Sequence, residues 1–268
     1  MIPGALLCAF LICERAIAAD LHPIVEIQSG YLFGATADGK WLKADETAKA
    51  LSGGTTYQVY GLTEPLGESK GGKPKPSEED VCSDVLTVSL SPKPEKGVIA
   101  IAAPWNALPR KPRIADRTQQ VYVDAVRDFL KTKGIEQPKV KIDNVLRVDL
   151  DGDGEDEVLI SATNYFSKDD SVPMRSPAGS YSMVLLRRVV SEKIETQLVE
   201  GEFHPKAYTK TPEFDAPNVY KVIAVLDLDG DGKMEIVVGS NYYEGEAITI
   251  YRCDSKKIEP LLSVGCGA

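Results

Sequence analysis

The sequence has few of the side chains that usually carry out catalysis. Its only two histidines, His22 and His204, lie far apart without metal-ligand spacing, and we expect both at the surface. It has no GxSxG, HExxH or P-loop motif and no CxxC pair, which argues against serine hydrolases, zinc proteases, P-loop enzymes and structural zinc sites. A carboxylate pair for glycoside hydrolysis stays open, because such pairs are assembled only in space. These absences make an enzyme the less favoured interpretation.

The sequence also lacks a long apolar run and a surplus of basic residues. No apolar run reaches the roughly 20 residues that a membrane-spanning helix needs. Acidic side chains outnumber basic ones by 40 to 31, so the formal net charge is −9 and nothing favours nucleic-acid binding. Hydrophobic residues make up 43% of the 268 residues, which is enough for one or two cores.

Residues 1–19 have features of a secretory signal peptide. An apolar stretch at 5–13 precedes the small residues 16–19, a site of the kind that signal peptidase cuts. The usual basic residue near the start is missing and Glu14-Arg15 interrupts the pattern, so a short buried strand or helix is the alternative. We expect residues 1–19 to be removed and the mature protein to be secreted or periplasmic.

Cleavage there would leave three of the five cysteines, Cys82, Cys253 and Cys266. An odd number allows at most one internal disulfide and leaves one thiol. Cys253 and Cys266 close a short carboxy-terminal loop, and we expect these two to pair.

Most of the chain after residue 19 shows the alternation and turn residues of β-strands. In an N-terminal β region, residues 20–112, the predicted strands are 24–28, 31–36, 40–42, 57–62, 85–90 and 98–102. A tight turn is expected at Asp38-Gly39, and residues 66–80, rich in glycine, proline and charge, are expected to be a mobile loop. In a second region, residues 113–268, the predicted strands are 140–148, 157–166, 181–190, 194–203, 219–226, 234–243 and 247–252.

One amphipathic helix is predicted at the start of the second region. Asp116 is its expected cap, because Gln119 lies at capping-box spacing, and Gly134 is its expected end. The apolar side chains expected on one face are Val123, Val126, Phe129 and Leu130.

An internal repeat is the strongest pattern in the sequence. Residues 145–160 align with residues 223–238 at an offset of 78, and each copy is an apolar strand, an acidic loop and a second apolar strand. The loops are DLDGDGEDE at 149–157 and DLDGDGKME at 227–235, and together they account for the whole net charge of −9. Such concentrated charge repels itself unless a cation is present.

The spacing within each loop matches the needs of a hard cation such as Ca²⁺, which takes six to eight oxygen ligands. Alternate positions 1, 3 and 5 are aspartates, position 7 would offer a backbone carbonyl, and position 9 is a closing glutamate. Glycines at positions 4 and 6 permit the sharp turn. The predicted ligands are Asp149, Asp151, Asp153, Glu155 (backbone) and Glu157 in the first loop, and Asp227, Asp229, Asp231, Lys233 (backbone) and Glu235 in the second.

The loops have two alternative interpretations. A solvated acidic turn would explain one copy but not two copies in the same phase. Residues 222–230 also resemble the first motif of haloacid-dehalogenase-type phosphotransferases, whose leading aspartate is a nucleophile assisted by Mg²⁺. That fold alternates strands with helices and uses its motif once, whereas this chain repeats the motif and follows each copy with a strand.

The two loops between apolar strands resemble the calcium-binding blades of FG-GAP/VCBS-type repeats, found in integrin-α-like β-propellers. The resemblance covers residues 140–254 and implies that each loop ligates one Ca²⁺ through the residues named above. Glutamate replaces the common aspartate at position 9, the 78-residue spacing is long, and only two copies are evident. The fold implied is mainly β, with partial or small β-propeller-like repeats or, alternatively, a β-sandwich.

We therefore expect a secreted or periplasmic protein with two structural Ca²⁺ ions that brace its hairpin loops. Its expected partner is an unidentified protein or carbohydrate. The alternatives left open are a calcium-stabilised extracellular hydrolase, a purely structural envelope module and, less favoured, a Mg²⁺-dependent phosphatase. Trp41, Trp105, Tyr242 and Tyr243 could line a carbohydrate surface, but we expect them to pack in the core or in turns.

Overall fold

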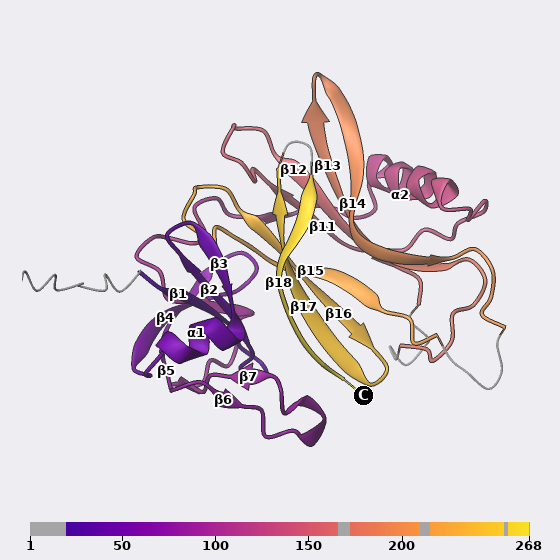
Figure 1. Ribbon diagram of the computed structural model, residues 1–268. Coiled ribbons are helices and arrows are strands. Elements are labelled where there is room, and N and C mark those ends of the chain that lie inside the picture. Colours follow the sequence, from indigo (N-terminus) through magenta and orange to yellow (C-terminus); the bar gives the residue numbers. More distant parts are fainter. Residues whose placement is uncertain (1–19, 166–171, 210–214, 255–256, 268) are drawn as a thin grey trace, which may run out of the picture.

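The computed structural model describes residues 20–165, 172–209, 215–254 and 257–267 (Figure 1). The predicted signal peptide, residues 1–19, lies outside the described residues. Strands make up 48% of the structure and helices 10%, which confirms the mainly β prediction. The strands form open antiparallel sheets, and the described residues form no closed barrel.

The first sheet has seven strands in the order β3-β2-β1-β9-β4-β5-β8 and carries the N-terminal part of the chain. Its strands are β1 His22–Glu26, β2 Leu32–Ala37, β3 Lys40–Lys43, β4 Thr55–Tyr60, β5 Pro65–Gly71, β8 Leu90–Ser91 and β9 Ile99–Ile101. The predicted turn at Asp38-Gly39 joins β2 to β3, and both residues have positive φ. A small side sheet of β6 Lys75–Pro76 and β7 Leu86–Thr87 flanks the short 3-10 helix η1 Asp80–Cys82.

Two expectations for this region were wrong. Residues 66–80 are not simply a loop, because they include β6 and all of β5 except its first residue, and β5 pairs with both β4 and β8. A short helix, α1 Ala44–Ala50, follows β3 where no helix was predicted. The sequence feature that marks the start of this helix is Glu46, whose side chain accepts the Lys43 backbone N–H in a capping interaction at 3.1 Å.

The second sheet has the order β10-β11-β12-β13-β14 and contains the first acidic loop. Its strands are β10 Arg113–Ile114, β11 Ile142–Val148, β12 Glu157–Thr163, β13 Ser180–Val190 and β14 Lys193–His204. The predicted helix is α2 Gln120–Thr132, which buries Tyr122, Val126 and Leu130 against this sheet. Asp116 is not its cap. The cap residue is Gln119, and the Asp116 carboxylate instead accepts the N–H and hydroxyl of Thr118.

The third sheet has the order β15-β16-β17-β18 and contains the second acidic loop. Its strands are β15 Val219–Leu226, β16 Glu235–Tyr242, β17 Gly245–Cys253 and β18 Ile258–Gly267, the last of which was not predicted. The two repeats therefore form two antiparallel meanders, β11–β14 and β15–β18. Their first hairpins share one register, because Val148 pairs with Glu157 as Leu226 pairs with Glu235, 78 residues on.

The second and third sheets pack together through β15. The backbone N–H of Val222 donates to the Ser161 hydroxyl of β12 at 3.1 Å, and that of Tyr220 donates to the Ser182 hydroxyl of β13 at 2.8 Å. These buried hydroxyls satisfy edge-strand donors that would otherwise lack partners. One apolar core contains side chains from all three sheets, so the strands that flank the acidic loops are fixed by packing.

The disulfide joins Cys82 to Cys266, so the expected Cys253–Cys266 pair is wrong. Both Cys253 and Cys266 lie in the β17–β18 hairpin, but Cys253 faces Ile258 at one end and Cys266 faces Glu246 toward the other. Glu246 and Cys253 are seven positions apart along the strand, which is about 23 Å and far beyond disulfide reach. The bond instead ties η1 to the last strand across 184 residues of sequence.

Candidate metal centre

The two acidic loops lie at the same end of the second and third sheets, each connecting the first two strands of its repeat. The first joins β11 to β12 and the second joins β15 to β16. The glycines at positions 4 and 6 all take the left-handed backbone conformation, with φ of 83° and 93° at Gly152 and Gly154 and of 76° and 84° at Gly230 and Gly232. The expected use of these glycines is confirmed, since other residues adopt such angles only with strain.

Each loop is folded by the same set of hydrogen bonds to its own carboxylates. The position 1 aspartate accepts the backbone N–H groups of both glycines, at 2.6 and 3.1 Å in the first loop and at 2.7 and 3.1 Å in the second. The position 9 glutamate accepts the N–H of position 2, at 2.8 Å from Leu150 and at 2.9 Å from Leu228. Position 3 accepts the N–H of position 5, and position 5 accepts that of position 7, in both copies. The sequence repeat is therefore also a repeat of geometry.

Three carboxylates converge in each loop. Oxygens of Asp149, Asp151 and Glu157 all lie within 4.8 Å of one another, and the same holds for Asp227, Asp229 and Glu235. These are positions 1, 3 and 9 of the predicted ligand sets. The position 5 aspartates, Asp153 and Asp231, are not part of either group and turn to the N–H groups of Glu155 and Lys233. The ligand roles of position 5 and of the position 7 carbonyls stay predictions.

Convergence of like charges under partial burial changes the acidity of the groups. Burial raises the pKa of Glu235 to about 9, with further contributions from Asp229 and Asp231. Burial and the same two aspartates also raise the pKa of Asp227. In the first loop burial raises the pKa of Glu157, and Asp151 and Asp153 add to the effect. The pKa shift is thus larger in the second loop, whose glutamate is the more deeply buried.

One arginine links the two loops. The Arg110 guanidinium donates to the carbonyls of Asp149 and Leu150 in the first loop, at 2.5 and 3.0 Å, and to that of Gly232 in the second at 2.7 Å. A backbone hydrogen bond from Met234 to the Leu150 carbonyl, 2.8 Å long, joins them directly. No motif pointed to Arg110, because it lies about 40 residues before the first loop and acts on backbone atoms.

The second loop is also held by the N-terminal part of the chain. Thr36 of β2 donates its hydroxyl to the Leu228 carbonyl at 3.1 Å, and the Trp105 indole N–H donates to the Asp227 carbonyl at 2.9 Å. The Asp227 N–H in turn donates to the Ala107 carbonyl at 2.8 Å. Trp105 therefore packs in a turn, as expected, and the second loop is braced by two regions of the chain.

The chemistry of the donor set fits a divalent hard cation. Each loop presents carboxylate oxygens converging on a single position, and hard cations such as Ca²⁺ take oxygen ligands of this kind. The second loop already attracts a cationic side chain, because Arg252 of β17 pairs with Asp229 at 2.7 Å. Burial lowers the pKa of Arg252, but Asp229, Glu235 and Asp231 raise it overall. A third cluster, of Glu79, Cys82 and Cys266, has both sulfurs in the disulfide and so offers no thiolate.

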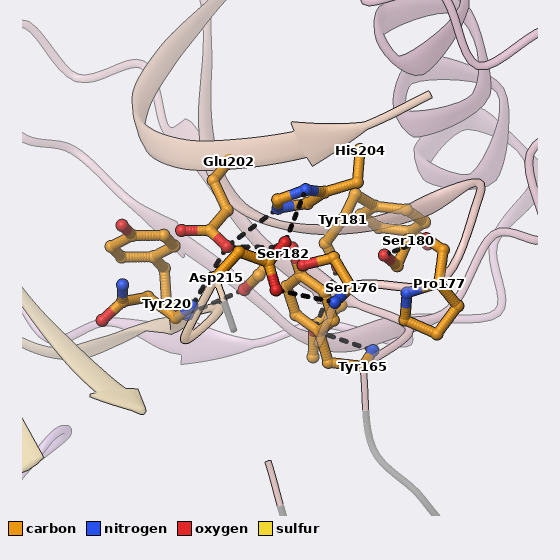
Figure 2. Close-up of polar contacts among 12 residues, drawn as sticks. Tyr165, Ser176, Pro177, Ser180, Tyr181, Ser182, Glu202, His204, Asp215 and Tyr220 are labelled. Atoms are coloured by element: carbon orange, nitrogen blue, oxygen red, sulfur yellow. Dashed lines mark hydrogen bonds and ion pairs between the residues drawn. The ribbon is translucent and has the colours of Figure 1, made fainter. Parts of the chain in front are cut away.

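Both histidines have more structured surroundings than expected, and both are half-buried rather than exposed. His22 makes a 3.1 Å contact through Nδ1 to the Ala102 carbonyl. Figure 2 shows His204 between two carboxylates, with Nε2 at 3.0 Å from Glu202 and Nδ1 at 3.4 Å from Asp215. The Tyr165 hydroxyl donates to the same Glu202 oxygen at 3.0 Å, and burial and Glu202 raise the pKa of Tyr165.

This cluster fastens loops rather than arranging a nucleophile. Asp215 accepts the backbone N–H of Ser176 at 2.9 Å (Figure 2). Glu202 accepts the backbone N–H of Asn218 at 3.2 Å. The described interactions of His204 are thus with carboxylates and an aromatic ring, not with a serine or cysteine. In the described part of the chain, the acidic loops remain the best-formed candidate site.

Comparison with known families finds a match in one part of the chain. Residues 221–251, from β15 through most of β17, match the family model of the FG-GAP repeat. The comparisons with curated proteins and with solved structures gave no match. The predicted resemblance is therefore confirmed for the second repeat, the one that contains Asp227 to Glu235. No helix among the described residues is both long and apolar enough to cross a membrane.

Proposed function

We propose that this FG-GAP-type repeat protein binds two Ca²⁺ ions, one in each acidic loop, and that the ions brace the molecule rather than take part in chemistry. Asp149, Asp151 and Glu157 would hold the first ion, and Asp227, Asp229 and Glu235 would hold the second. The observation that carries the proposal is the convergence of three carboxylates in each loop within 4.8 Å. Burial and, to a smaller extent, the neighbouring carboxylates raise the pKa values of Glu157, Asp227 and Glu235, and ions there would offset both effects.

The brace would act between regions distant in sequence. The loops contact each other through Arg110 and Met234, and the second loop contacts Thr36 and Trp105. Ordering both loops would therefore stabilise the contact between the two repeats and the N-terminal part of the chain. Binding to the native state alone contributes about 2.7 kcal/mol per site at a hundredfold excess over Kd.

We further propose a secreted or periplasmic location and a role in binding a protein or a carbohydrate. FG-GAP repeats are typical of extracellular interaction modules, and the Cys82–Cys266 disulfide is of a kind that persists outside the reducing cytosol. The phosphatase alternative is disfavoured, because β15 and β16 pair antiparallel and no helix follows β15 directly. In the part of the chain that the structure describes, no side-chain arrangement favours the hydrolase alternative.

The test is calorimetric titration with Ca²⁺, paired with thermal unfolding in Ca²⁺, Mg²⁺ or chelator. We expect two ions per chain and a higher unfolding temperature in Ca²⁺ than in Mg²⁺, because Mg²⁺ gives up its hydration water reluctantly. Asp229→Ala should lower the stoichiometry to one, whereas Asp45→Ala, on the exposed face of α1, should leave it at two. Coincident unfolding curves in all three solutions would disprove the proposal.

A further inference from the structure

The two repeats carry an arginine at equivalent positions of their third strands. In the first repeat Val158, which follows Glu157, pairs with Arg187 of β13, and the next residue is Arg188. In the second repeat Ile236, which follows Glu235, pairs with Tyr251 of β17, and the next residue is Arg252. Each arginine thus lies beside the closing glutamate of its own loop.

The two arginines are used differently. Arg252 donates from Nη2 to Oδ2 of Asp229 at 2.7 Å, and the Asp229 side chain is only 5% exposed. The guanidinium also lies over the Trp41 ring, 6.0 Å from its centroid, which holds the charge next to the loop. Arg252 is therefore a positive charge in direct contact with one of the three converging carboxylates of the second loop.

Arg188 is directed away from its own loop. Its Nη1 donates to the Asp254 carbonyl at 2.6 Å, in the β17–β18 connection of the other repeat, and its Nη2 donates to the Gln197 side chain at 2.8 Å. Arg110 does approach the first loop, but it hydrogen-bonds carbonyls of both loops, and its Nε lies 3.9 Å from Asp149. Among the described side chains, the converging carboxylates of the first loop have no cationic partner as close as Arg252 is to Asp229.

From this difference we infer that Arg252 is a built-in counter-cation that weakens calcium binding in the second loop, so that the first loop fills at lower calcium concentration. The inference rests on the proposed function. A guanidinium on Asp229 neutralises part of the charge that attracts the ion and repels the ion itself. A unit charge and a divalent ion a few ångströms apart change affinity on the order of tenfold or more, even in water. The protein would then respond to calcium in two steps, and the second step would order the loop that Thr36 and Trp105 contact.

The experiment is calorimetric titration of the full chain with Ca²⁺ for the wild type and four single variants. We expect two dissociation constants in the wild type, at least tenfold apart. Glu157→Gln should remove the tighter event and Glu235→Gln the weaker one, which assigns each constant to its loop. Arg252→Gln keeps a hydrogen-bond donor but removes the charge, and should tighten the weaker site about tenfold. Arg188→Gln is the matched control and should leave both constants within about twofold of the wild type.

Several results would overturn the inference while leaving two bound ions in place. These are equal constants in the wild type, a tighter site in the second loop, or weaker binding by Arg252→Gln, which would make Arg252 a positioning residue for Asp229. Should Arg252→Gln not fold, Glu157→Gln and Glu235→Gln still show which loop fills first, and a second loop that fills first would contradict the inference. Absence of bound Ca²⁺ in the wild type would instead reject the proposed function itself, and the inference with it.

Discussion

The two acidic loops share their internal geometry but differ in their surroundings. Both place glycines at positive φ, and both fold round the position 1 aspartate and the position 9 glutamate with hydrogen bonds of nearly the same length. Yet Asp151 of the first loop is exposed, whereas its counterpart Asp229 is largely covered and paired with Arg252. A repeated sequence thus reproduces the local fold, while the rest of the chain determines the electrostatic environment.

The largest effect expected from this difference concerns Glu235 in the calcium-free protein. Its pKa of about 9 lies above the ordinary value of 4.5, so the folded state keeps a proton that the unfolded state releases. Stability is therefore fully present below about pH 4.5 and falls as pH rises to about 9, by up to about 1.4 kcal/mol per pH unit. Glu235→Gln should remove this slope and raise the free energy of unfolding at pH 7 by about 3 kcal/mol, measured by urea unfolding in chelator.

Glu157→Gln provides the matched comparison in the more exposed loop. Burial raises its pKa in the same direction, but Glu157 is 8% exposed against 1% for Glu235, so the gain in stability at pH 7 should be smaller. With Ca²⁺ present both substitutions should destabilise, because each then removes an ion ligand. Equal pH slopes for the two variants in chelator would show that the loops do not differ as the structure indicates.

The geometry that the two loops share could be predicted from the sequence, because it depends on residues within each loop and its hairpin. Glycine at positions 4 and 6 and the apolar strands on either side lie within one loop and its hairpin, and these features predicted the strands, the turn and the converging positions 1, 3 and 9. Position 5 was placed in the same ligand set by spacing alone. In the structure Asp153 and Asp231 lie outside the two converging groups and accept backbone N–H groups, and their role as ligands stays a prediction.

The differences between the loops could not be predicted, because they arise from contacts between distant residues. Arg110 and Thr36 reach the second loop from 122 and 192 residues away. The same reason explains the error in the disulfide, since Cys82 meets Cys266 only after the N-terminal part packs against the last repeat. Arg188 and Arg252 occupy equivalent positions, and no sequence rule says which of them turns toward its own loop.

Arg110→Gln should have an effect of intermediate size and should act on both loops together. The guanidinium is the shared donor to three loop carbonyls, and hydrogen bonds from charged groups contribute about 1.5–3 kcal/mol each when buried. Because Arg110 is partly exposed, we expect a total loss of about 2 kcal/mol in thermal or urea unfolding.

The control for Arg110→Gln is Arg113→Gln, whose exposed side chain pairs with Asp156 outside the predicted ligand sets. That substitution should cost less than about 1 kcal/mol. Calcium titration adds a second criterion, because loss of the shared arginine should alter the affinity of both sites. A change confined to one site would mean that Arg110 does not couple the loops.

The smallest expected effect comes from adding a single methyl group, by a glycine-to-alanine substitution, to each loop in turn. Alanine at Gly152 or Gly230 must adopt a positive φ in either case, which costs about 1–2 kcal/mol. A Cβ at Gly230 would also lie 3.1 Å from ring atoms of Trp105, which is held by its hydrogen bond to Asp227. A Cβ at Gly152 would lie 3.4 Å from the Arg110 guanidinium, which is an ordinary van der Waals distance. Gly230→Ala should therefore be about 1 kcal/mol more destabilising than Gly152→Ala.

Gly154→Ala and Gly232→Ala complete this comparison, because a Cβ at either position meets nothing within 4 Å. Both carry the backbone strain alone, so their losses in unfolding free energy should agree within about 0.5 kcal/mol. The four variants together separate strain, which the repeat makes equal, from packing, which the neighbouring Trp105 makes unequal. If Gly152→Ala proved the costlier member of its pair, Trp105 would not be the rigid support of the second loop that its hydrogen bond and packing indicate.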